Sequence, residues 1–78
     1  MKYLLYELTE DFDIIIKFTF YKHNMLQDFI KMHTEEKNYE PRFLVIELND
    51  DDDIDFISHY QGTKEISKKY VVDYVDKW

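Results

Sequence analysis

Two stretches near the start of the chain alternate apolar and polar residues with a period of two. In residues 2–9 the apolar positions are Leu4, Tyr6 and Leu8, and in residues 12–21 they are Phe12, Ile14, Ile16, Phe18 and Phe20. This alternation is typical of β-strands with one face on a core. The polar segment between them, Thr9-Glu10-Asp11, is short, so we predict an antiparallel hairpin.

The next segment has apolar residues at helical spacing. They are Met25, Leu26, Phe29, Ile30, Met32 and His33, which predicts a helix over about 25–36. Asn24 and Gln27 resemble a capping box at its start. Residues 37–41 end in Pro41 and are expected to form a loop. The continuous apolar run 43–46 then predicts a central strand buried on both faces.

The last third of the chain has a less decisive pattern. Asn49 and the aspartates at 50–53 offer N-caps for a short helix that contains Ile54, Phe56, Ile57 and Tyr60 and ends at Gly62. Beyond it, Ile66, Tyr70, Val71, Tyr74, Val75 and Trp78 match helical spacing, whereas the residue types prefer strands. We favour a helix that begins at Ser67, its predicted N-cap.

These elements predict a single α+β domain over residues 1–78. The expected order is strand, strand, helix, strand, helix, helix, with the last element alternatively a strand. An antiparallel hairpin and a third strand would pack against two or three helices. With 78 residues there is room for one small core, to which seven Tyr and six Phe bring large buried areas.

The composition also indicates a cellular compartment. The chain contains no cysteine, so it must fold without disulfides, which fits a reducing environment. Its N-terminal residues reach Glu7 before an apolar stretch of signal-peptide length can form, and no apolar run is long enough to span a membrane. We therefore expect a cytoplasmic protein without a membrane span.

Acidic residues are concentrated in two places. The chain has 17 Asp and Glu against 10 Lys and Arg, a net charge of −7, which disfavours direct binding of nucleic acid or anionic lipid. The predicted hairpin carries Glu7, Glu10, Asp11 and Asp13, and the segment after the third strand carries Glu47, Asp50, Asp51, Asp52, Asp53 and Asp55. The simpler interpretation of each acid is a solvated loop residue. As a group, they are our candidate contacts for a basic partner.

Metal, cofactor and catalytic chemistry find little support in the sequence. An EF-hand loop that starts at Asp51 would have Phe56 where glycine is required and Gly62 where glutamate is required. The three histidines lie on different predicted elements, and His33 is expected at a helix end or on the surface. No phosphate-binding glycine loop or nucleophile motif is present. We expect neither an enzyme nor a bound metal or cofactor.

Acid-rich, cysteine-free and aromatic-rich chains of this size resemble the small inhibitors with which bacteriophages disable host DNA-binding proteins by mimicking DNA. The resemblance is one of composition over the whole chain, and it transfers no individual residue. It implies a basic host partner such as a nucleoid protein, a restriction or CRISPR effector, a DNA glycosylase or RNA polymerase. The physical basis is that fixed carboxylates can occupy a groove that binds phosphates.

Exposed aromatic residues give an alternative interpretation. The tyrosines and Trp78 exceed what a core of this size needs, and exposed Tyr and Trp are common anchors of protein interfaces. In this second hypothesis the chain is an interaction or immunity-like module that uses aromatics and a strand edge, and its acidity serves solubility. Either hypothesis is compatible with a homodimer.

Overall fold

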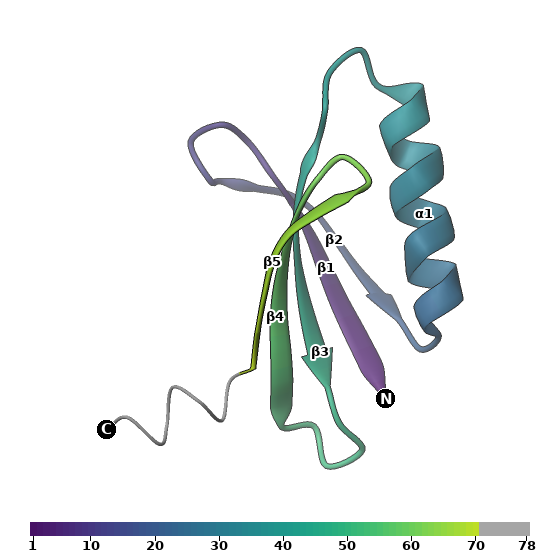
Figure 1. Ribbon diagram of the computed structural model, residues 1–78, viewed down its shortest axis with the longest axis vertical. Helices are drawn as coiled ribbons and strands as arrows, with labels where there is room; N and C mark the ends of the chain where they lie inside the picture. The colour runs from purple at the N-terminus through teal and green to yellow at the C-terminus, as the bar shows by residue number, and fades with distance from the viewer. Residues whose placement is uncertain (71–78) are drawn as a thin grey trace.

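The computed structural model describes residues 1–70, which form one β-sheet and one helix. The strands are β1 (Lys2–Leu8), β2 (Ile14–Phe20), β3 (Arg42–Leu48), β4 (Ile54–Gln61) and β5 (Lys64–Tyr70), and the helix is α1 (His23–Glu36). All neighbouring strands are antiparallel, in the order β2-β1-β3-β4-β5. Figure 1 shows α1 along one side of the sheet, where it contacts β1 and β2.

Three sequence predictions are confirmed. The alternating stretches form the β1–β2 hairpin, the helical pattern forms α1, and the apolar run forms β3 at the centre of the sheet. Two details are wrong. Helix α1 begins at His23, so Asn24 lies inside it, and its N-cap Lys22 makes no capping bond through its side chain. Strand β3 is fully buried on one face only, because no described helix packs on the other.

The predicted fold class is wrong, because the segment after β3 forms strands. Residues 54–61, expected as a short helix, are β4, which pairs with the free side of β3. Residues 64–70, where we favoured a helix from Ser67, are β5. The two strands are joined by Gly62-Thr63, and the φ of +59° at Gly62 suits this tight turn. The described chain is therefore mostly β, with a single helix. Residues 71–78, the remainder of the predicted last helix, lie outside the described residues.

The core lies between α1 and the three strands beneath it. Leu26 and Ile30 of α1 are buried against one face of the sheet, and the buried cluster is completed by Tyr3, Leu5, Phe43 and Val45. Phe29 extends the cluster towards the β2 edge through ring contacts with Phe18 and Phe20, at centroid distances of 5.0 and 5.4 Å. Packing is thus concentrated on the face of the sheet that α1 covers.

The first four strands are two copies of one hairpin. Residues 7–14 (ELTEDFDI) and 47–54 (ELNDDDDI) match at five of eight positions. In both copies the register shifts at the same point, after Glu7 and after Glu47. Leu5 pairs with its own counterpart, Val45, so the two copies are related by an approximate two-fold axis between β1 and β3. This repeat was not predicted, although the shared residues make it visible in the sequence.

Candidate binding surfaces

The predicted acidic residues do not form one array. Glu10, Asp11 and Asp13 lie in the β1–β2 turn, and Asp50 to Asp53 lie in the β3–β4 turn. These turns are at opposite ends of the sheet (Figure 1). They are separated by the length of β1, about 20 Å at roughly 3.4 Å per residue. The fold therefore displays two separate acidic turns, related by the approximate two-fold axis.

Both acidic turns have the same backbone structure. Thr9 and Asn49, the first residues, donate their N–H to the carbonyl oxygens of Asp13 and Asp53, both at 2.9 Å. The fourth residue has a positive φ in each turn, 65° at Phe12 and 62° at Asp52. Thr9 Oγ1 accepts one backbone N–H, whereas Asn49 Oδ1 accepts two, from Asp51 and Asp53. The two sets of carboxylates are therefore carried on equivalent, hydrogen-bonded turns.

The three remaining acids that we predicted as partner contacts interact with other residues of the chain itself. Glu7 is only 2% exposed and pairs with Nε2 of His33 from α1. Glu47, the counterpart of Glu7, is half-buried, and its carboxylate lies 3.7 Å from Nζ of Lys68 on β5. Asp55 lies at the register shift of β4 and accepts a hydrogen bond from Asn49 Nδ2 at 3.3 Å. In the β3–β4 turn, Asp50 and Asp52 also pair, with the N-terminal ammonium at 2.9 Å and with Lys2 Nζ at 3.5 Å, but their side chains stay exposed. The acids accessible to a partner are therefore those of the two turns.

The Glu7–His33 pair joins α1 to the centre of the sheet. The His33 ring stacks on Phe29 at 5.2 Å between centroids and meets Phe43 edge-on at 5.9 Å. His33 lies in the last turn of α1, as expected, but its side chain is packed inside the molecule and not on the surface. His33 follows Leu26 and Ile30 at helical spacing, which places it on the buried side of α1. That spacing was the available signal, but it could not identify the partner.

The face of the sheet opposite α1, called the open face from here on, has no described element packed on it. Its residues follow from the strand register. Three rows cross all five strands: Thr19, Leu4, Ile46, Ile57 and Lys69; Lys17, Tyr6, Leu44, His59 and Ser67; Ile14, Leu8, Arg42, Gln61 and Lys64. The apolar residues at its centre are half-buried by one another. The sequence predicted that strand faces would be covered, so this surface was missed.

The open face differs in charge from the rest of the molecule. Its three rows contain Lys17, Arg42, Lys64 and Lys69 and no aspartate or glutamate, although the whole chain carries 17 acids. Lys17 Nζ lies 5.8 Å from the centre of the Tyr6 ring, and the Arg42 guanidinium lies 5.6 Å from that of Phe12. The open face thus combines an apolar centre with basic groups around it.

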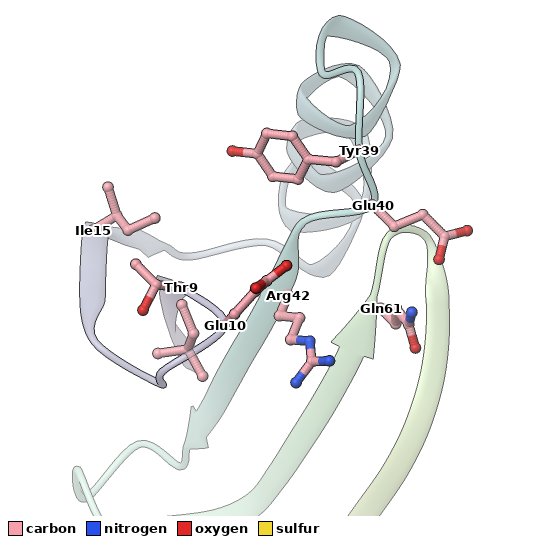
Figure 2. A pocket seen from close by; sticks show the side chains of 8 residues that line it. Thr9, Glu10, Ile15, Tyr39, Glu40, Arg42 and Gln61 are labelled. Atoms are coloured by element: carbon pink, nitrogen blue, oxygen red, sulfur yellow. The ribbon is translucent and has the colours of Figure 1, made fainter.

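One end of the open face is hollowed. A pocket of about 560 Å³ is lined by Leu8, Thr9, Glu10, Ile15, Tyr39, Glu40, Arg42 and Gln61. Figure 2 shows Arg42 and Gln61 on the neighbouring strands β3 and β4, with Tyr39 and Glu40 on the segment that leads into β3 and Thr9 and Glu10 at the β1–β2 turn. Among the described residues Arg42 has no ion-pair partner. Its guanidinium lies over the Phe12 ring, and Glu10 and Glu40 line the same pocket.

The surroundings of two tyrosines near the core raise their pKa values. Burial raises the pKa of Tyr60 above its ordinary value of 10.0, and the carboxylates of Glu65 and Glu47 raise it further. Burial likewise raises the pKa of Tyr3, with a second contribution from Glu47. Both effects disfavour the charged phenolate. Neither tyrosine is on the open face, so these shifts concern stability and not binding.

Among residues 1–70, no group of three or more histidine and carboxylate side chains is arranged to hold a metal ion. Helix α1 is neither long enough nor apolar enough to cross a membrane. A scan against protein-family models matches no family, and searches of curated proteins and of solved structures find no match.

Proposed function

We propose that this chain is a non-catalytic protein-binding module whose partner docks on the open face. The observation that carries the proposal is the open face itself, an apolar surface that no described element covers, with basic residues and no carboxylate in its three rows. Glu10 and Glu40 lie only at the rim, where they line the pocket. Interfaces between proteins commonly have an apolar centre and a polar rim. This is the interaction-module hypothesis of the sequence analysis, with the binding surface moved from exposed aromatics to the sheet.

The charge of the open face indicates an acidic partner. Lys17, Arg42 and Lys64 would meet carboxylates, while the acidic turns at the ends of the sheet would repel partners that approach elsewhere. Complementary charges speed association and exclude wrong partners. A carboxylate of the partner that enters the pocket would pair with Arg42, whose planar guanidinium suits a bidentate contact.

The centre of the open face favours a protein over a nucleic acid. Sheets that bind single strands stack the bases on aromatic side chains. Here the first two of the three rows provide Tyr6 and His59 among aliphatic residues such as Leu44 and Ile46. Aliphatic side chains bury apolar surface but provide no stacking platform. The net charge of −7 also opposes the approach of a polyanion.

The proposal is tested by capture from a bacterial lysate with four baits. They are the wild-type chain, Leu44→Glu on the open face, Met32→Glu on the exposed side of α1, and a turn variant with Asp50 to Asp53 changed to Asn. Circular dichroism first establishes that each bait is folded. We expect one acidic protein to bind all baits except Leu44→Glu. Binding that survives in Leu44→Glu, or that nuclease treatment abolishes, contradicts the proposal.

The second candidate function is inhibition of a basic nucleic-acid-binding protein by DNA mimicry. It is supported by the pair of acidic turns, because equivalent carboxylates at two-fold related positions would suit a partner with two basic sites. The same capture experiment distinguishes it. Mimicry predicts a basic partner that is lost from the turn variant, kept by Leu44→Glu, and eluted by moderate salt.

We further propose that the protein acts in the cytoplasm. The support is the absence of cysteine from the whole chain, which suits a reducing compartment. Imaging of a tagged chain together with fractionation of the producing cells tests this location. Recovery in the cytoplasmic fraction is expected, and recovery outside the cell contradicts it.

A further inference from the structure

The two outer strands of the sheet differ in how they are protected. Strand β5 (KEISKKY) carries Lys64, Lys68 and Lys69, and lysines on an edge strand hinder pairing with another sheet. Strand β2 (IIIKFTF) has Lys17 as its one charged residue, and the others are Ile, Phe and Thr. These residue types favour strand pairing. Strand β2 is thus an edge without the usual protection.

The internal repeat shows what happens at the equivalent edge. The counterpart of β2 in the second hairpin is β4, and the outer side of β4 pairs with β5 in antiparallel orientation. The outer side of β2 pairs with no described strand. Unpaired backbone groups on a long edge strand are a template for a further strand. Among residues 1–70, the fold therefore pairs this edge with a further strand in one half and not in the other.

Apolar side chains continue from the β2 edge onto α1. Phe18 of β2 is 44% exposed and packs beside Phe29 of α1. Met25 and Met32 lie four residues before and three residues after Phe29, which places them on the same side of the helix. They are 53% and 61% exposed. Together, Phe18, Met25, Phe29 and Met32 form an apolar strip, called the β2 flank, beside the open edge.

We propose that a second copy of this chain pairs with β2 in antiparallel orientation, which joins two five-stranded sheets into one of ten strands. The two-fold axis passes through Phe18 and runs perpendicular to the sheet. Phe18 then faces its own copy, and Lys17 faces Thr19. An axis at Lys17 would oppose two lysines, which is unfavourable. The two helices lie on the same face, and each β2 flank covers the other.

The charges at the two ends of β2 support this pairing. Asp11 and Asp13 precede the strand, and Lys22 and His23 follow it. In an antiparallel pair the acidic start of one β2 lies beside the basic end of the other, and the symmetry repeats this contact at both ends of the seam. Opposite charges across strands stabilise pairing. This local complementarity opposes the general repulsion between two chains of net charge −7.

The first test measures the mass of the full chain by sedimentation over a range of concentrations. We expect twice the 9.7 kDa of one chain. Phe18→Lys, which puts a charge at the centre of the seam, should reduce the mass to that of the single chain. Ile66→Lys, the matched change on the β5 edge, should leave the dimer intact. A wild-type chain that stays at single-chain mass throughout, or a dimer lost in Ile66→Lys, overturns the proposal.

Exchanging the charged residues that flank β2 tests the antiparallel arrangement without a change in the strand itself. Asp13→Lys and Lys22→Asp each place like charges at both ends of the seam, and each should raise the dimer dissociation constant about tenfold. The double variant should restore it. Aspartate at the N-cap favours the helix, so weaker dimerisation of Lys22→Asp would not reflect a damaged α1. Failure of the double variant to recover contradicts this pairing.

The dimer and the proposed partner site use different surfaces. Leu44→Glu should keep the mass of the dimer, and Phe18→Lys should keep binding to the acidic partner. A loss of dimer in Leu44→Glu would place the self-association on the open face and overturn the proposal for β2.

Discussion

The two hairpins share a motif but differ in the element that comes after each of them. After the first hairpin the chain forms α1, whose His33 reaches back to bury Glu7. After the second it forms β5, whose Lys68 approaches the equivalent Glu47; the Lys68 side chain is 45% exposed and that of Glu47 14%. The same residue at the same place in the same hairpin thus pairs with a buried histidine in one half and with a partly exposed lysine in the other. The next element along the chain decides which.

The element that follows each hairpin also distinguishes the two faces of the sheet and its two edges. The helix covers one face of the sheet, and no described element covers the open face. Strand β5 pairs with the outer side of β4, whereas no described strand pairs with the outer side of β2. Substitutions at matched positions of the two halves test whether the covering element, and not the hairpin itself, sets the role of each residue.

The largest difference in the free energy of unfolding is expected between variants that remove the partner of Glu7 and the partner of Glu47. His33→Ala leaves a buried carboxylate unpaired and should lower the free energy of unfolding by about 3–5 kcal/mol. Lys68→Ala removes a partly exposed ion pair and should cost less than about 1 kcal/mol. Urea denaturation of both variants measures this. Similar losses in the two variants would show that the hairpins are not used differently.

The next difference concerns the two faces of one strand. Leu5 is fully buried beneath α1, and Leu5→Ala should cost about 2–5 kcal/mol through lost contacts and the cavity left behind. The neighbouring Leu4 points to the open face, and Leu4→Ala should cost about 1 kcal/mol. Chemical denaturation of the two variants compares them directly. An equal cost would mean that the open face is covered in the folded protein.

Substitutions of the first residue of each acidic turn should differ by a smaller amount in their cost to stability. Asn49→Ala removes the acceptor of two backbone N–H groups and should cost about 2 kcal/mol, at about 1 kcal/mol for each bond. Thr9→Ala removes the acceptor of one such group and should cost about 1 kcal/mol. Thermal unfolding gives both values. A greater loss in Thr9→Ala would contradict the hydrogen bonding described for the turns.

The smallest effect is confined to alkaline pH. The position of Tyr60 in β4 corresponds to Phe20 in β2, and burial raises the pKa of Tyr60 above 10.0. The unfolded chain therefore loses this proton first, and the free energy of unfolding should fall as the pH rises above about 10. Tyr60→Phe should lessen this fall and have no such effect below about pH 9. Urea titrations at several pH values follow the slope, and an unchanged slope contradicts the assignment.

Much of the first half of the fold follows from local sequence patterns. The period of two in β1 and β2 and the helical spacing in α1 are local patterns, so these elements are visible without knowledge of the partners. In β1 the pattern indicated the wrong face, because Leu4, Tyr6 and Leu8 lie on the open face and the buried positions are Tyr3, Leu5 and Glu7. Strand β4 was mistaken for a helix because Ile54, Ile57 and Tyr60 also fit a helical spacing. Its pairing with β3 is a long-range contact, which a local pattern does not show.

The candidate binding surfaces were harder to predict for the same reason. The acidic clusters are obvious in the sequence, but their separation to opposite ends depends on the strand order. The open face combines residues from five strands, and its lack of acids appears only once the register is known. The Glu7–His33 pair joins residues that are 26 positions apart. The hairpin repeat, in contrast, was available from residues 7–14 and 47–54 alone.

The central claim is that the open face is the partner site, and nuclear magnetic resonance mapping tests it most directly. The isotope-labelled chain is titrated with the acidic protein recovered by capture, and shifts of backbone and methyl signals are followed. We predict that the largest changes cluster at Leu4, Tyr6, Leu44, Ile46 and Arg42. Changes that instead cluster at the two acidic turns, with the open face unaffected, would contradict the account and favour DNA mimicry.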